Sequence, residues 1–219
     1  MAKSRRTTVW QRDPCCFLGA LRFFTVYRHN PLDSTSISDD QVESLLVDRT
    51  GTLWVGIRQK SGLNRFDAAT GTFTRYLHDP DDPHSLNDGQ VNVLYEDRDG
   101  ILWIGSQGGL SRFDPGTETF TRYVHNEDDP SSLSHDEVRA LYEDRNGVLW
   151  IGASAGGLNR YDPATGTLAR YQHDPSNPTG LGSNSIWNIY ESQDGVLWIG
   201  TLGGGLVQAG PQSIPAVHL

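Results

Sequence analysis

Cysteine, methionine and long apolar runs are scarce in this sequence of 219 residues. The two cysteines, Cys15 and Cys16, are adjacent, so they can neither join distant segments nor form a spaced metal motif. No segment reaches the roughly 18 to 20 apolar residues of a membrane-spanning helix. We therefore expect a globular chain without a membrane span, and the cysteines leave its redox compartment undecided.

Positive charge is also scarce. The chain has 18 lysine and arginine residues against 27 aspartate and glutamate residues, which gives a formal net charge of −9. Proteins that bind nucleic acids usually present a basic patch or stripe to the phosphates. We predict no nucleic-acid partner.

The N-terminus has basic residues but only a short apolar segment after them. Lys3, Arg5 and Arg6 resemble the charged start of an export signal, yet polar residues and Pro14 interrupt the apolar stretch that such a signal requires. The remaining apolar segment, 15–21, is at the short limit for a signal peptide. We interpret residues 1–21 as an unstructured leader, and the compartment stays unknown.

Four copies of the motif Leu-Trp-(Val/Ile)-Gly occur along the chain. Their tryptophans recur at intervals of 49, 47 and 48 residues. A fixed period of this length indicates propeller blades or helical arrays. The motif tryptophans are Trp54, Trp103, Trp150 and Trp198.

The second copy shows which of these architectures applies. Residues 90–97 are rich in β-branched and aromatic side chains, and the Asp99-Gly100 turn leads into an apolar run at 101–106. Glycine and proline turns separate two further runs, at 110–114 and 119–125. The pattern predicts four short antiparallel strands, A to D, which form one blade of a β-propeller.

We predict an all-β propeller domain at 22–208, followed by a tail at 209–219. A lone D strand at 22–29 precedes blades at about 41–78, 90–125 and 137–173 and a final A-B-C unit at 185–208. A single blade buries too little surface, so the blades must stack, with the four motif tryptophans between them. Pairing of the two ends would close a ring of about four blades. We favour an open arc or a fragment of a larger propeller.

Several motifs recur in one order: LWIG, GGL, a strand such as LNRYD at 158–162, TGTF and RYxHDP. Together they resemble the two-component regulator propeller family over about residues 23–207. The resemblance implies seven-bladed propellers on the extracytoplasmic side of hybrid sensor histidine kinases or diguanylate cyclases, which often sense oligosaccharides. This sequence has no kinase or receiver segment and too few blades, so no signalling output is implied.

A weaker resemblance is to streptogramin lyase propellers, which use histidine and acidic residues with a metal ion. Candidate histidines exist here, but each lies 25 residues before the motif tryptophan of its copy. Equivalent positions around a propeller do not converge on one ion. We interpret them as polar contacts at strand ends, and predict no metal site, no cofactor and no catalytic residue. The four are His29, His78, His125 and His173.

Two sets of positions vary between copies inside the repeated frame. The first is the second residue of strand A, the innermost strand of a blade, and comprises Glu43, Asn92, Arg139 and Trp187. A carboxylate, an amide, a guanidinium and an indole at one channel mouth would suit hydroxyl-rich ligands. Unconstrained surface positions are an equal alternative. The second set lies in the B to C turn, includes Arg58 and Gln107, and indicates binding only if it shares a face with the first.

We expect a non-catalytic propeller segment that senses a ligand or binds a partner. An oligosaccharide or another small polar molecule is the expected ligand. Two alternatives stay open. One is a lyase-type enzyme, and the other is an interaction scaffold in which self-association or a partner completes the ring.

Overall fold

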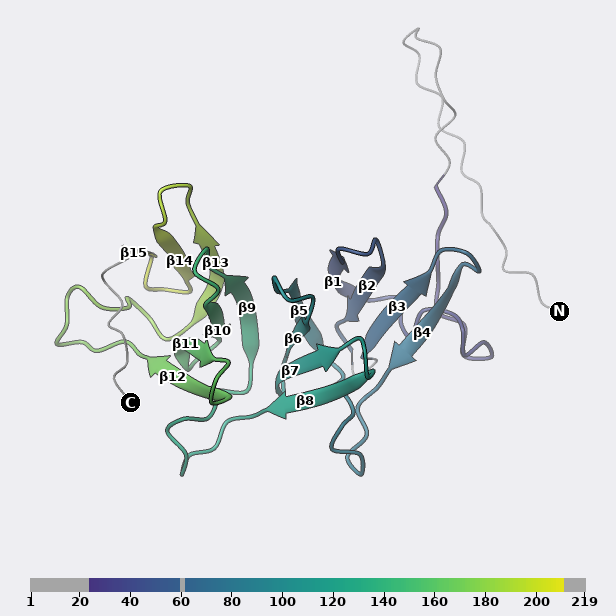
Figure 1. Ribbon diagram of the computed structural model, residues 1–219, viewed down its shortest axis with the longest axis horizontal. Helices are drawn as coiled ribbons and strands as arrows, with labels where there is room; N and C mark the ends of the chain where they lie inside the picture. The colour runs from purple at the N-terminus through teal and green to yellow at the C-terminus, as the bar shows by residue number, and fades with distance from the viewer. Residues whose placement is uncertain (1–23, 60–61, 211–219) are drawn as a thin grey trace, which may run out of the picture.

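The computed structural model describes residues 24–59 and 62–210, which form fifteen strands in four antiparallel sheets (Figure 1). Consecutive strands pair within each sheet, so each sheet forms one blade, numbered 1 to 4 along the chain. The predicted leader at 1–21 and most of the predicted tail lie outside the described residues.

Blade 1 contains β1 (Val42–Val47), β2 (Leu53–Ile57), β3 (Leu63–Asp67) and β4 (Thr72–Tyr76). Blade 2 contains β5 (Val91–Glu96), β6 (Leu102–Ser106), β7 (Gly109–Asp114) and β8 (Thr119–Tyr123). Blade 3 contains β9 (Val138–Glu143), β10 (Leu149–Ala153), β11 (Gly157–Asp162) and β12 (Thr167–Tyr171), and blade 4 contains β13 (Ile186–Glu191), β14 (Leu197–Thr201) and β15 (Leu206–Ala209).

The blades form an open arc. Figure 1 shows them side by side, with the A strands β1, β5, β9 and β13 along the inner side and blades 1 and 4 at the two ends. Among the described residues, no strand pairing joins blade 4 to blade 1. The predicted all-β class and the preference for an open arc are confirmed, and β5 to β8 differ from the predicted strands by at most two residues at either end. No helix that could cross a membrane occurs at 24–59 or 62–210.

A carboxylate fixes the turn between strands A and B in blades 1 to 3. In blade 2, Asp97 accepts hydrogen bonds from Nε1 of Trp103 at 2.7 Å and from two turn amides at 3.0 and 2.9 Å. Gly100 closes the turn at a φ of 84°, which glycine adopts without steric cost. The buried indole thus has a partner for its only donor. Asp48 and Asp144 bind Trp54 and Trp150 in the same way.

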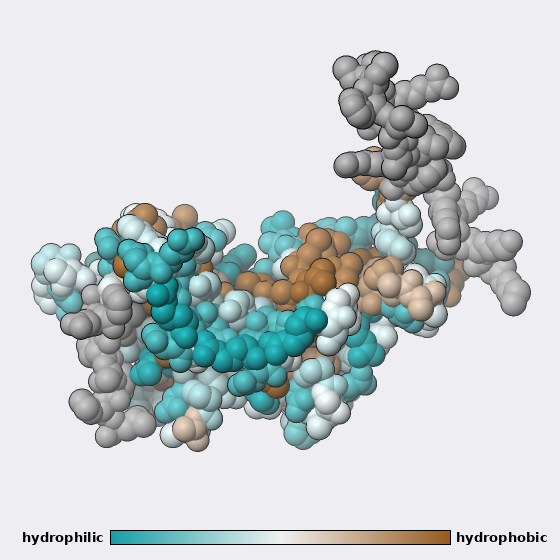
Figure 2. Space-filling view, turned by 45° about the horizontal axis from the view of Figure 1, so that its top comes forward, coloured by the Kyte–Doolittle hydropathy of each residue, from teal (hydrophilic) through white to brown (hydrophobic). Residues whose placement is uncertain are grey.

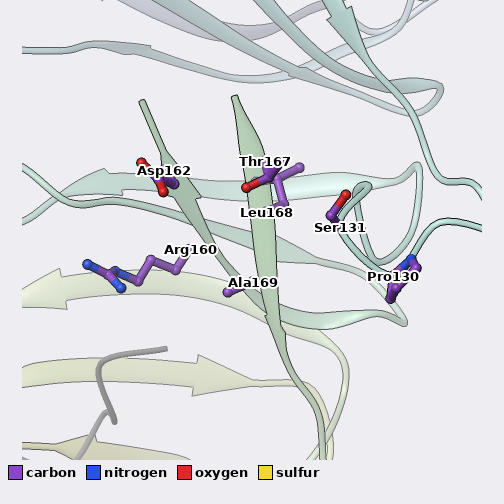
Figure 3. A pocket seen from close by; sticks show the side chains of 7 residues that line it. All are labelled: Pro130, Ser131, Arg160, Asp162, Thr167, Leu168 and Ala169. Carbon is purple, nitrogen blue, oxygen red and sulfur yellow. The ribbon is translucent and has the colours of Figure 1, made fainter. Parts of the chain in front are cut away.

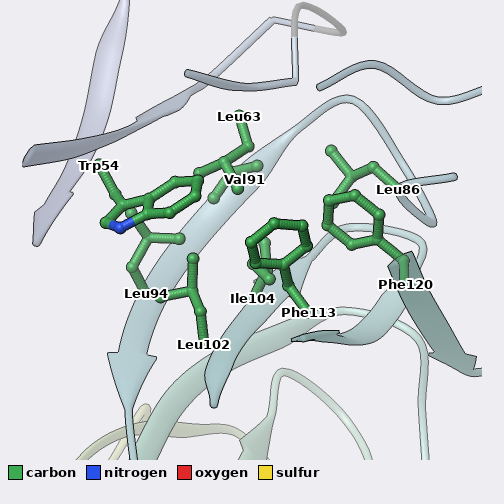
Figure 4. Packing of buried hydrophobic residues seen from close by; sticks show 9 residues of the cluster. All are labelled: Trp54, Leu63, Leu86, Val91, Leu94, Leu102, Ile104, Phe113 and Phe120. Atoms are coloured by element: carbon green, nitrogen blue, oxygen red, sulfur yellow. The ribbon is translucent and has the colours of Figure 1, made fainter. Parts of the chain in front are cut away.

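The hydrophobic cores lie between the blades. Trp54 of β2 packs in one cluster with residues of blade 2, among them Val91 and Leu94 of β5 (Figure 4). Trp103 packs with residues of blade 3, and Trp150 with residues of blade 4. A blade therefore buries its apolar face only beside a neighbour.

The glycine of the tryptophan motif allows adjacent blades to approach closely. A Cβ atom on Gly105 would lie 2.6 Å from Cγ1 of Val138, which begins strand A of blade 3. Gly56 and Gly152 have the equivalent contact at 2.5 Å. At Gly200 in blade 4, the nearest atom would be 3.5 Å away. Glycine is thus sterically required wherever another blade follows.

An ion pair also joins each blade to the next, at the A to B turn. Nε of Arg49 lies 2.8 Å from Oε1 of Glu96, the last residue of β5, and Nε of Arg145 lies 2.7 Å from Oε1 of Glu191. The glutamate side chains are largely buried. Burial makes the pairing more demanding, because an unpaired charge there would be desolvated without compensation. Arg98 and Glu143 form the third pair.

A second arginine ties strand D to the loop before strand A of the same blade. In blade 2, Nε of Arg122 donates to the carbonyl of Ser85 at 2.8 Å, and its Nη2 donates to the Ser85 hydroxyl. The guanidinium thereby satisfies a loop that has few backbone partners of its own. Arg75 and Arg170 bind Ser36 and Ser132 in the same way.

The strand predicted at 22–29 is not a strand in its described part, residues 24–29. A D strand forms only beside a C strand, and none of the described strands pairs with this segment. Its register nevertheless matches the other copies. Tyr27 packs edge-on against Phe66 and Phe73, with ring centroids 5.0 and 5.6 Å apart, as Tyr76 packs against the next blade. Residues 24–29 thus occupy the D position of a blade before blade 1.

Replacing Gly105 by alanine tests the close contact between blades. We expect a loss of about 1–3 kcal/mol in the free energy of unfolding, because the new methyl group overlaps Val138 of the next blade and Val93 of its own sheet. Gly200→Ala is the matched control, with an expected change below about 0.5 kcal/mol. Urea unfolding of dilute protein, followed by tryptophan fluorescence, measures both. Equal losses for the two variants would contradict the steric explanation.

Candidate functional site

Each A strand contains a β-bulge at its second residue. In blade 2, Val91 pairs with Ser106 and Val93 pairs with Gly105, so Asn92 has no partner in the ladder. The same register shift occurs in the other three blades. A bulge re-aims its side chain away from the alternation of the strand. The four bulged residues are Glu43, Asn92, Arg139 and Trp187, which we call the bulge row.

The B to C turns lie at the same end of the blades as the bulge row. The first residue of each turn donates its amide to the residue just before strand A: Arg58 to Gln41 at 2.9 Å and Gln107 to Gln90 at 3.2 Å. Equivalent bonds of 2.8 and 2.9 Å occur in blades 3 and 4. The two variable sets thus lie at the same strand end of each blade and share one face of the arc, as a common binding site requires.

Neighbouring members of the bulge row are connected across the blade boundaries. Nδ2 of Asn92 donates to the carbonyl of Val138 at 3.0 Å. The guanidinium carbon of Arg139 lies 5.2 Å from the ring centroid of Trp187, and Nε of Arg139 donates to Glu137 at 2.8 Å. The row is therefore continuous from blade 2 to blade 4.

Glu43 lies apart from this continuous stretch, at the exposed start of β1. Its carboxylate is 3.9 Å from Nε of Arg58, whose side chain is 65% exposed. Such an exposed ion pair is weak and is readily exchanged for another partner. The side chain of Gln107 is also exposed. These residues offer hydrogen-bonding groups that are not committed to the fold.

The chemistry of the bulge row combines a flat apolar face with fixed polar groups. Trp187 remains 43% exposed although it stacks with Arg139. Glu137 holds the guanidinium in place, so its remaining N–H groups have a defined direction. An indole face beside guanidinium and amide donors can stack against one side of a sugar-like ring and bind its hydroxyl groups.

The four repeated histidines are structural contacts. Nδ1 of each ring is bonded to a loop carbonyl eight residues later: His29 to Ile37 and His78 to Leu86, both at 2.9 Å. The predicted polar contact at the strand end is confirmed. The four histidines lie in different copies of the repeat, and the described residues contain no group of three or more His, Cys, Asp or Glu residues that could hold a metal ion. His125 and His173 bind Leu133 and Leu181.

Sequence reasoning missed a shallow groove on the outer edge of blade 3 (Figure 3). Its volume is about 250 Å³, and its lining includes Pro130, Ser131, Arg160, Asp162 and Leu168. These residues come from strands C and D and from the loop before strand A. The same strand-C arginine occurs in blades 1 and 2, so repetition in the sequence gave no signal of a special role here.

Three segments of the chain match the sequence profile of the family described as Two component regulator propeller, at residues 85–108, 132–155 and 180–203. Two solved extracellular domains from B. thetaiotaomicron, both assigned to hybrid two component systems, are similar in structure. BT4673 has 25% identity over 86% of this chain and 23% of that chain, with a TM-score of 0.68. BT3049 has 25% identity over 85% of this chain and 29% of that chain, with a TM-score of 0.57. The chain thus spans less than a third of either domain.

Virginiamycin B lyase from Staphylococcus aureus is a more distant structural match. It has 15% identity over 91% of this chain and 61% of that chain, with a TM-score of 0.57, which shows a shared fold alone. No curated protein matches the chain in sequence.

Asn92→Ala tests whether a bulged side chain also joins two blades. We expect a loss of about 0.5–1.5 kcal/mol in the free energy of unfolding, since the variant removes the amide that donates to the Val138 carbonyl. Gln107 is exposed and lies in the B to C turn of the same blade. Gln107→Ala should therefore change stability by less than about 0.5 kcal/mol. Thermal and urea unfolding measure both. A loss no larger than that of the control would show that the bond contributes nothing.

Proposed function

Because this chain contains two component regulator propeller repeats, we propose that it belongs to an extracytoplasmic, non-catalytic sensor region that binds a hydroxyl-rich ligand at its bulge row. The family match and the likeness to extracellular domains of hybrid two component systems support the sensor assignment. Neither comparison identifies a ligand. The proposal for the site rests on the geometry of the row.

The stack of Arg139 on Trp187 is the observation that carries the ligand proposal. An aromatic face with a cation beside it binds polar cyclic molecules through stacking and charge-assisted hydrogen bonds. The bulge has removed both side chains from the ladder, so their chemistry is not needed to hold the blade together. Asn92 and the exposed Arg58 add polar groups on the same face of the arc, in blades 2 and 1.

A lyase-type activity has less support. Catalysis of that kind needs histidine and acidic groups to converge on one point. Here each repeated histidine binds the loop of its own copy, and the paired carboxylates recur once per blade. The structural likeness to the lyase extends to the fold alone.

A binding screen tests the proposal. Thermal melting of the protein is measured with a panel of neutral and acidic mono- and oligosaccharides, and each compound that raises the melting temperature is titrated calorimetrically. We expect a stabilising sugar whose affinity falls about tenfold or more in Arg139→Ala and Trp187→Ala, as each variant removes one directional contact.

Arg160→Ala is the control, because that guanidinium lies in the outer groove of blade 3 and away from the bulge row. It should leave the affinity unchanged. Absence of stabilisation by every sugar, or full affinity in both bulge-row variants, would refute the proposed site. Loss of binding in Arg160→Ala alone would assign the ligand to the outer groove instead.

A further inference from the structure

The outer face of blade 1 has the apolar surface that a preceding blade would cover. Leu45 is 64% exposed, whereas its counterpart Leu94 in blade 2, which contacts blade 1, is 8% exposed. Val42 and Val47 are exposed beside it. Figure 2 shows hydrophobic surface gathered over this part of the molecule. Comparison with the boundary between blades 1 and 2 therefore shows that this face lacks a covering blade.

The far face of blade 4 has the matching deficiency. Leu206 is 66% exposed, whereas the equivalent Leu158 of blade 3 is 2% exposed under blade 4. Tyr190 is also exposed, and Trp198 is only partly buried. This face thus presents a motif tryptophan to a blade that should follow, and the described residues contain no such blade.

Both end faces have lost the ion pair that marks every internal boundary. Gln193 occupies the turn position where blades 1 to 3 have arginine. Val47 occupies the end of strand A, where blades 2 to 4 have the glutamate that receives it. A blade with arginine would place an unpaired cation against Val47. Gln193 is neutral, so the far face of blade 4 is the better partner for blade 1.

A second pair is lost in the same coordinated way. Val26 occupies the position in the segment 24–29 where strand D of every other copy has arginine. Gly180 occupies the loop position before blade 4 where the other loops have the serine that binds this arginine. The two changes lie at opposite ends of the chain. A D strand without the arginine needs no serine partner, and a loop without the serine has no partner for an arginine.

The open strand edges are complementary too. Within 24–59 and 62–210, β15 is a C strand with no D strand beside it, and residues 24–29 lie in a D position with no C strand beside them. In complete blades the motif leucine of strand C pairs with the strand-D tyrosine, as Leu110 does with Tyr123. The same register would place Leu206 opposite Tyr27.

We infer that the far face of blade 4 is a docking surface for blade 1 of a second copy of this chain, joined head to tail. The N-terminal segment of the second copy then supplies strand D of blade 4 by β-strand addition. Blade 1 and blade 4 lie at opposite ends of the arc (Figure 1), so a single copy does not satisfy itself. A head-to-tail interface closes into a ring or continues as a filament. The inference is independent of the proposed ligand.

Cysteine cross-linking tests the register directly. In a Cys15→Ser/Cys16→Ser background, Tyr27→Cys protein is mixed under oxidising conditions with differently tagged Leu206→Cys protein. Residues directly opposite in an antiparallel pair are within disulfide reach. We expect a disulfide between the two tags. Leu32→Cys, at the exposed loop residue, replaces Tyr27→Cys in the control and should give none.

Sedimentation of the unmodified chain measures association. Three variants then test whether the residues at the inferred contact determine it. Gln193→Arg should weaken association about tenfold or more, and adding Val47→Glu should restore it. Gly200→Ala should weaken association to a similar extent, since its methyl group would meet Val42 of the second copy as Gly105 meets Val138. Circular dichroism confirms that each variant folds.

A single-chain mass at all concentrations, with no mixed disulfide, would overturn the inference. So would a disulfide that forms only within one chain carrying both Tyr27→Cys and Leu206→Cys, because the chain would then close on itself. Association that persists in Gln193→Arg and Gly200→Ala would show that other surfaces mediate it.

Discussion

The close approach of strand A to the tryptophan strand of the preceding blade is the contact on which the whole structure depends. It needs a glycine on one side, Val or Ile on the other, and an indole held in plane by the turn aspartate. Gly105 illustrates the steric requirement, and Asp97 illustrates the polar one. Because these contacts span two sheets, stability is a property of neighbouring pairs of blades, as in other repeat proteins. The end blades therefore differ physically from the middle ones.

Most of the fold was predictable from the sequence because it is written in repeated local signals. The Asp99-Gly100 turn and the alternation after it placed β5 to β8 within two residues of their observed ends. The segment 24–29 carries the sequence pattern of strand D at Tyr27 but is not a strand in this structure, since strand pairing requires a neighbour. Sequence pattern reports what a segment prefers, and the ladder depends on what lies beside it.

The candidate site was only partly readable. Variation between copies marked the strand position of Arg139 and Trp187, but nothing in the sequence showed that each copy contains a bulge there, since a register shift depends on both paired strands. The coordinated changes at Val47 and Gln193 were visible in the sequence, yet they had no meaning until the structure showed that the equivalent residues bind across a blade boundary. Pairwise comparison of copies is informative once the pairs are known.

The bulge separates two tasks that share one strand. A bulged residue forms no rung of the ladder, so its identity is free of the steric demand that keeps its neighbour Val91 a Val or Ile in every blade. Every duplication of such a blade adds one more side chain that varies outside the ladder of its own sheet. The bulge row thus contains one variable side chain per blade. A repeat protein can therefore diversify its inner edge while its architecture stays constant.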